Sequence, residues 1–166
     1  MSFPKYKTIL YATDLGDNMR PVLRHAISLA KHYDAKIIMF HAVEPLSSAG
    51  QWVLEAYLSK KSDMIGEEGE LKKVLAKMKD RLERFYKDEL ADSLPDVNPK
   101  CVSDIVVVNG HAAEEIRKFA DQNSVDLIVM GTHTKEVITH GLLGSTARKL
   151  THIIKTPVLV IPVNMD

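Results

Sequence analysis

The segment between Gly131 and Ser145 has the residue types of an anion-binding loop. It follows a short apolar run at 126–130 that is typical of a buried strand, and it leads into residues 146–154, whose apolar side chains recur at helical spacing. A glycine-bearing loop between a strand and a helix can direct backbone N–H groups at an anion, and the helix dipole adds to the attraction. The first functional hypothesis is therefore a ligand that carries phosphate.

Other residues that could carry metal or covalent chemistry lack the pattern for it. None of the seven histidines combines a compact pair of ligands with a third one. Cys101 lies at the edge of an apolar stretch, where a packing role is expected. There is no G-x-S-x-G elbow, and Gly144 stands where a P-loop would have a lysine. The sequence predicts no metal site and no catalytic residue, and at most slow hydrolysis of a bound nucleotide.

Size and charge narrow the class of protein. A chain of 166 residues suits one domain, 1–166, with a full-sized core. Lysine plus arginine equals aspartate plus glutamate at 22 each, so the basic excess of a nucleic-acid-binding protein is missing. No window is apolar and long enough for a membrane span, and the N-terminal residues lack the pattern of a secretory signal. We expect a cytoplasmic protein that binds neither nucleic acid nor membrane.

The elements that must position the loop alternate between strand and helix. Five continuous apolar runs indicate strands that are covered on both faces, as in parallel sheets. Parallel neighbours need crossover helices, so the pattern predicts an α/β fold, a doubly wound sheet with helices on both faces. The expected strands are 8–12, 36–43, 102–108, 126–130 and 157–162, and the expected helices are 19–33, about 67–90, 111–123 and 146–154.

Two stretches fall outside this alternation. Residues 94–99 form a connector that contains two prolines. Residues 44–69 make a longer excursion, in which 51–58 could form a short apolar helix. We interpret this helix as extra packing at the sheet edge, while a cover over a ligand or a contact for a partner stays open.

Five segments in order resemble the universal stress protein family, and together they span nearly the whole chain. The resemblance implies an adenine nucleotide alpha hydrolase-like fold with a five-stranded parallel sheet in the order 3-2-1-4-5. It also implies a homodimer and, in many members, ATP bound through a G-x-x-G, nine residues, G-S/T pattern. The five segments are 7–14, 40–44, 110–116, 126–131 and 156–162.

The glycine pattern maps onto this sequence with one departure. Gly131 takes the first position, Gly144 and Ser145 take the last two, and residues 135–143 are the nine between. At position 134 the family's second glycine is replaced by threonine, whose branched side chain disfavours positive φ. Two functions therefore stay open: a regulatory or protective stress protein that binds ATP, and a protein-interaction module of the same fold that has lost the nucleotide.

The expected strand order places a ligand site at one edge of the sheet. With the order 3-2-1-4-5 the switch point lies between strands one and four, so the loops after both strands meet in one crevice. The resemblance implies that Asp14 accepts a hydrogen bond from the adenine amine or a ribose hydroxyl, and that the Ala42 backbone contacts adenine. A turn or cap role for Asp14 is the alternative. The predicted nucleotide site is Ala12, Thr13, Asp14, Ala42, Gly131, His133, Thr134, Gly144, Ser145 and Thr146.

Two further expectations concern partners. A divalent metal such as Mg²⁺ on the phosphates would relieve the repulsion between ATP and Asp14. Residues 158–162 form an apolar edge strand, and such edges invite pairing with another copy of the chain. Together with the resemblance, this predicts a homodimer through antiparallel pairing of the final strands.

Overall fold

The computed structural model of the protein describes residues 3–45, 67–93, 101–132 and 143–163. Two of the expectations above, the short apolar helix at 51–58 and the connector at 94–99, lie outside these ranges. So do two of the predicted site residues, His133 and Thr134.

Five parallel strands form one sheet with the order β3-β2-β1-β4-β5. This confirms the doubly wound fold that the apolar runs and the resemblance predicted. The continuous apolar composition of the strands is explained by β1, in which all five side chains are buried because both faces of the sheet are covered. The strands are β1 (Thr8–Ala12), β2 (Lys36–Val43), β3 (Val102–Asn109), β4 (Leu127–Gly131) and β5 (Val158–Ile161).

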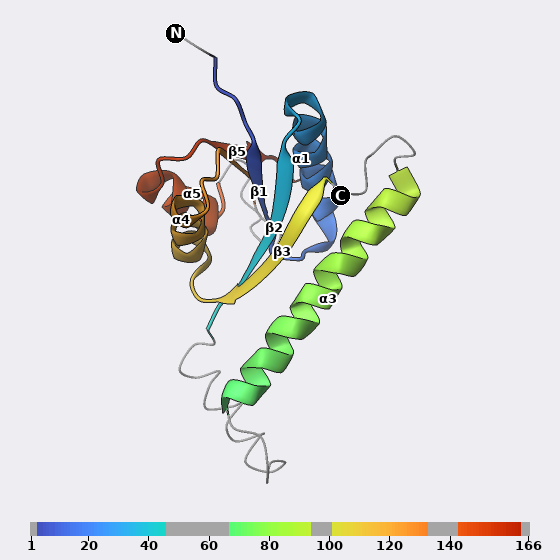
Figure 1. Ribbon diagram of the computed structural model, residues 1–166. Coiled ribbons are helices and arrows are strands. Elements are labelled where there is room, and N and C mark those ends of the chain that lie inside the picture. The colour runs from blue at the N-terminus through green and yellow to red at the C-terminus, as the bar shows by residue number, and fades with distance from the viewer. Residues whose placement is uncertain (1–2, 46–66, 94–100, 133–142, 164–166) are drawn as a thin grey trace.

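The helices cover the two faces of the sheet in pairs. Helices α1 and α3 lie on one side, and α4 and α5 lie on the other (Figure 1). Observed bounds differ from the expected ones by no more than three residues, the largest difference being the C-terminal end of α3. The helical elements are η1 (Asp17–Met19), α1 (Arg20–Tyr33), α3 (Glu67–Ser93), α4 (Ala112–Gln122) and α5 (Ser145–Ile153).

Alternate residues of each central strand enter two separate hydrophobic clusters. In β1, Ile9 and Tyr11 point into the cluster under α1 and α3, whereas Leu10 and Ala12 point into the cluster under α4 and α5. Strand side chains alternate between faces, so two covered faces require apolar residues at every position. Ala12 is the last residue of this strand, and the chain leaves the second cluster at the carboxyl edge of the sheet.

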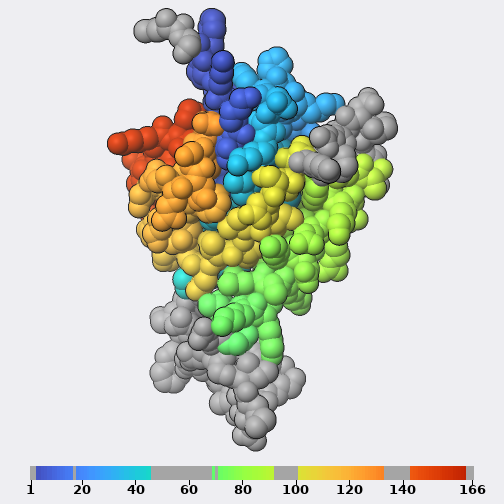
Figure 2. Space-filling model, viewed as in Figure 1, coloured from blue at the N-terminus to red at the C-terminus, as the bar shows by residue number. Residues whose placement is uncertain are grey.

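Helix α3 is held to the start of α1 by a buried carboxylate. The Glu89 side chain is fully buried and accepts hydrogen bonds from Arg20, at 3.3 Å, and from Arg24. Beside it, the Tyr11 hydroxyl donates to the Met19 carbonyl oxygen at 3.2 Å, and burial raises the pKa of Tyr11 above its usual range. The N-terminal turns of α3 extend past the body of the molecule (Figure 2), so the C-terminal half of this helix carries its packing.

Candidate functional site

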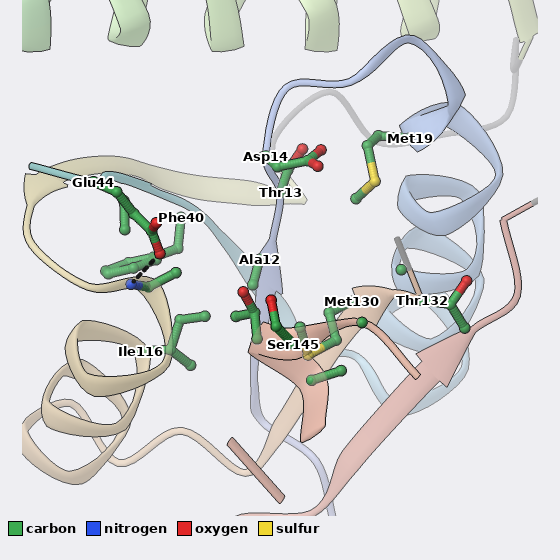
Figure 3. A pocket seen from close by; sticks show the side chains of 16 residues that line it. Ala12, Thr13, Asp14, Met19, Phe40, Glu44, Ile116, Met130, Thr132 and Ser145 are labelled. Carbon is green, nitrogen blue, oxygen red and sulfur yellow. Dashed lines mark hydrogen bonds between the residues drawn. The ribbon is translucent and has the colours of Figure 1, made fainter. Parts of the chain in front are cut away.

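A pocket of about 260 Å³ lies beyond the carboxyl ends of the central strands. Strands β1 and β4 are neighbours here, and their connections run to opposite faces of the sheet, which makes this the switch point of the fold. Figure 3 shows side chains from both connections lining the pocket. The lining residues are Ala12, Thr13, Asp14, Met19, Phe40, Ala42, Glu44, Ala112, Ile116, Met130, Gly131, Thr132, Gly144, Ser145, Thr146 and Ala147.

Eight of the ten residues predicted for the site lie in this one pocket. The two that remain, His133 and Thr134, lie outside the described residues. The structure thus brings together the predicted residues that it describes, and their contact with a ligand stays a prediction. The eight are Ala12, Thr13, Asp14, Ala42, Gly131, Gly144, Ser145 and Thr146.

The loop after β1 is fixed by its own side chains. The Thr13 hydroxyl accepts a hydrogen bond from the Leu15 amide, and Asp14 Oδ1 accepts one from the Gly16 amide, both at 3.0 Å. These bonds stabilise Leu15 in the left-handed region, at φ 62°. His41 adds a hydrogen bond from Nδ1 to the Thr13 carbonyl oxygen at 2.8 Å. The turn role considered for Asp14 is therefore present, and it occupies only one of the two carboxylate oxygens.

The first turn of α5 leaves backbone donors open at the pocket. The cap residue is Gly144, which has no side chain to accept from them, and the turn contains no acidic residue. Within the described ranges, the amides of Ser145, Thr146 and Ala147 have no hydrogen-bond acceptor. Three unsatisfied donors at the positive end of a helix form an anion-binding arrangement. The hydroxyl of Ser145 is exposed beside them.

Gly144 lines the pocket, but its amide is engaged within the protein. Its amide donates to the Thr132 carbonyl oxygen at 2.9 Å, which joins the start of α5 to the end of β4. Of the predicted residues Gly144, Ser145 and Thr146, the first therefore does not offer its amide to a ligand. The donors begin one residue later and extend to Ala147, because the helix uses the preceding amide to close the loop.

The reason for glycine at position 131 is steric. A Cβ atom at Gly131 would lie 2.8 Å from Val163 Cγ2 and 3.3 Å from Met19 Sδ. Positive φ does not explain the two glycines of the pattern, because Gly144 has φ −56° and Gly110 is the positive-φ glycine among the described residues. The phosphate-loop pattern at Gly131 is thus explained by close packing against the chain that follows β5.

Sequence reasoning missed Glu44, the most polar addition to the pocket. It follows β2 directly, as Asp14 closely follows β1, and that shared position at the carboxyl edge of the sheet was a usable signal. Glu44 Oε1 accepts a hydrogen bond from the Ala112 amide at 3.4 Å, drawn as a dashed line in Figure 3. The carboxylate therefore interacts with the first turn of α4. At this second helix N-terminus, the first amide already has an acceptor.

The rest of the missed lining is mostly apolar. Phe40 of β2 and Met130 of β4 lie under the pocket, and Ile116 contributes from α4. All three are buried, so they form a firm apolar wall. A pocket with apolar walls and a few convergent polar groups is typical of small-molecule sites. These residues escaped prediction because strand and helix patterns indicate burial without indicating which buried residues border a cavity.

Two kinds of feature, a metal cluster and a membrane-spanning helix, are absent from the described residues. In them, no cluster of three or more histidine, cysteine, aspartate or glutamate side chains is placed to hold a metal ion. Among the helices of the same ranges, none combines the length and the apolar character needed to cross a membrane.

The fold and the pocket define an α/β protein with a ligand site at the switch point of a 3-2-1-4-5 sheet. The sequence model of the universal stress protein family matches residues 5–162. The chain belongs to the universal stress protein family. This confirms the resemblance stated from the five segments.

Curated relatives and solved structures agree with this assignment. Universal stress proteins MJ0531 and MJ0577 of Methanocaldococcus jannaschii are each 32% identical to the chain; the matches cover 94% of it and 82% and 94% of the relatives. The solved structure of MJ0577 is similar with a TM-score of 0.67 and 27% identity, over 97% of this chain and 99% of that one. A universal stress protein in complex with cAMP has a TM-score of 0.53 and 21% identity, over 96% and 99% of the two chains.

Proposed function

We propose that this universal stress protein binds an adenine nucleotide, ATP in the first instance, in the pocket at the switch point. The observation that supports the proposal best is the set of amides at residues 145–147, which have no acceptor among the described residues and border a pocket with apolar walls. Phosphate is the common biological anion suited to such a helix end. The cAMP complex of a structural neighbour supports a nucleotide in this fold, although the neighbour's likeness to the chain extends to the fold alone.

The polar groups of the pocket suggest how the nucleotide would lie. Phosphates would contact the amides at the start of α5, beyond β4, and the base would rest against apolar side chains such as Phe40 and Ile116. Asp14 and Glu44 can only accept hydrogen bonds, so they suit the donors of adenosine, which are the amine of the base and the ribose hydroxyls. Glu44 follows β2, and β1 lies between β2 and β4. Two strand spacings of about 4.8 Å therefore separate the two ends of the site.

Mg²⁺ forms part of the proposal as a companion of the phosphates. It would be held by the triphosphate and water, since Mg²⁺ keeps several waters and often binds proteins through substrate phosphates. Its contribution is measured by comparing ATP titrations with and without Mg²⁺.

Two measurements test the nucleotide. The protein purified from cells is denatured, and the released small molecules are separated by chromatography; we expect an adenine nucleotide. The nucleotide-free protein is then titrated with ATP·Mg²⁺ in a calorimeter, where we expect saturable binding of one ATP per chain. If no nucleotide is released and the titration gives no heat of binding, the proposal is refuted.

We also propose that the protein acts in the cytoplasm as a homodimer with a regulatory or protective role in stress. Support for the dimer comes from β5, an edge strand in which Val158, Leu159 and Val160 are only partly buried. Light scattering at micromolar concentration should give twice the 18.6 kDa mass of one chain. A particle of one chain would contradict the dimer and leave the nucleotide proposal standing.

The alternative is a protein-interaction module of the same fold without a nucleotide. Its main support is the threonine at position 134, which lies outside the described residues. The calorimetric titration separates the two functions, because the module gives no heat with ATP. Replacing Thr134 by glycine adds a second comparison: a large gain in ATP affinity would show that the threonine obstructs the phosphates.

A further inference from the structure

Glu44 accepts a hydrogen bond from the start of a helix, whereas Asp14 accepts one from its own loop. One oxygen accepts from the Ala112 amide at 3.4 Å, and within the described residues the other oxygen has no partner. The side chain is exposed and lines the pocket. Its charge therefore acts on whatever occupies the part of the pocket between β2 and α4.

Among the lining residues that the structure describes, no lysine or arginine opposes this charge. The second carboxylate of this lining, Asp14, lies after β1, the strand next to β2. Glu44 already contacts the positive end of the α4 helix dipole through the Ala112 amide. One end of the pocket thus attracts anions and the other repels them.

We infer that Glu44 makes the pocket selective for nucleotides whose negative charge is confined to the 5′ end. This inference rests on the proposed function. A nucleotide with its 5′ phosphates at the start of α5 and free ribose hydroxyls meets acceptors at the far end. A nucleotide with an additional phosphate on the 3′ oxygen brings a second anion towards Glu44. Two like charges about 6 Å apart in a partly exposed site repel strongly enough to weaken binding roughly tenfold.

Two ligands with equal phosphate number test this effect through the change in their affinity ratio between variants, since the contribution of the second 5′ phosphate of ADP is common to all variants. ADP carries both phosphates on the 5′ oxygen, whereas adenosine 3′,5′-bisphosphate carries one at each position. Dissociation constants for both are measured by calorimetry on the wild type, on Glu44→Gln and on Asp121→Asn. Glutamine retains an oxygen for the Ala112 amide, so Glu44→Gln removes charge without removing the hydrogen bond. Asp121 is an exposed carboxylate of α4 that does not line the pocket, which makes Asp121→Asn the matched control.

The wild type should prefer ADP by about tenfold or more, and Glu44→Gln should reduce that preference by about three- to tenfold. Asp121→Asn should keep the wild-type ratio. On the wild type alone, raising the salt concentration from about 0.05 to 0.5 M should also reduce the preference, since the repulsion is screened. That measurement does not depend on the folding of any variant.

The outcomes separate this inference from the proposed function. If ATP and ADP bind but the ratio is the same in the wild type and Glu44→Gln, Glu44 has no role in selectivity and the nucleotide site stands. An equal loss of preference in Asp121→Asn would attribute the effect to net charge and overturn the inference as well. If no nucleotide binds, both proposals fail.

Discussion

Two helices begin at the pocket, and their first turns are built in opposite ways. At α4, Glu44 accepts from the Ala112 amide, and Glu114 and Glu115 stand in the first turn. At α5, the cap is a glycine, the first turn has no acidic residue, and the amides of residues 145–147 have no acceptor among the described residues. A helix N-terminus is thus an anion site only where the chain leaves its donors open. At α4 one amide of the first turn is engaged by Glu44 and two acidic residues stand in the same turn, whereas at α5 neither kind of competing group is present among the described residues.

The chain also enters the two helices differently. Gly110 leads directly from β3 through His111 into α4, with φ +152° and its amide bonded to the Val43 carbonyl oxygen at 3.0 Å. Before α5, residues 132 to 144 intervene, and the hydrogen bond between Thr132 and Gly144 joins their two ends. The first connection depends on backbone conformation, and the second depends on a hydrogen bond across a loop.

The largest expected effect comes from giving α5 the acidic character of α4. Ser145→Asp places a carboxylate among the open amides, so it should weaken ATP binding by about a hundredfold through repulsion and competition for the donors. The same change should leave the midpoint of thermal unfolding equal or higher, because an acidic residue in the first turn is worth about 0.3–1 kcal/mol to a helix. Ser145→Asn, which is neutral, is the control and should lose less affinity. Unchanged binding in Ser145→Asp would show that α5 is not the phosphate end.

The next effect concerns the entrance to α4. Gly110→Ala should lower the free energy of unfolding by about 2 kcal/mol, because its φ is unfavourable for alanine. The added Cβ would also lie 2.6 Å from Glu115 Cγ. Urea denaturation measures the loss. The double variant with Glu115→Ala should remain destabilised, since the backbone strain persists; full recovery would mean that side-chain crowding is the whole effect.

A smaller loss is expected at the end of β4. Gly131→Ala should cost about 1 kcal/mol by overpacking against Val163, 2.8 Å from the added Cβ. Val163→Ala removes the methyl group that the added Cβ would crowd. The double variant should therefore be more stable than the sum of the two single losses predicts. Additive losses in urea denaturation would contradict the steric explanation.

The smallest effect concerns an exposed ion pair between α4 and α5. Lys149 Nζ of α5 donates to Glu114 Oε1 of α4 at 2.8 Å, and this bond lowers the pKa of Glu114 below its ordinary value of 4.5. The stability that the pair contributes is therefore present above pH 4.5 and is lost as pH falls through the lower folded value. Glu114→Gln should barely shift the urea midpoint at pH 7, because exposed pairs contribute little. The difference between variant and wild type should vanish in more acidic solution, and a constant difference would contradict the pair's role.

Much of the fold was predictable because its signals are local. The five apolar runs were continuous, so strand positions were found within one or two residues, and α1 differed by one residue at its start. The strand order came from the resemblance, because periodicity does not specify which strands are neighbours. Helix α3 ends three residues later than expected, because residues 91–93 do not continue the pattern of large apolar side chains.

The site was predictable where a residue follows a strand and less so elsewhere. Gly131 came from the glycine pattern, and Ala42 and the ligand role of Asp14 came from the resemblance. The carboxyl edge of the sheet explained why the loops of Asp14 and Gly131 meet, and Glu44 could have been found from that edge. Met19 and Ile116 border the pocket from helices, and that depends on how the helices cross the sheet. The use of the Gly144 amide was hidden as well, since its acceptor, the Thr132 carbonyl, is a backbone atom common to every residue.

The hydrogen bond from Gly144 to Thr132 has a consequence for how firmly the start of α5 is placed. Thr132 is itself fixed by β5 and the residues after it, through its amide to Ile161 and its hydroxyl to Val163. The start of α5 is thereby tied to the ends of β4 and β5 by hydrogen bonds of described residues alone. A change that leaves these bonds intact should leave the position of the α5 N-terminus intact as well.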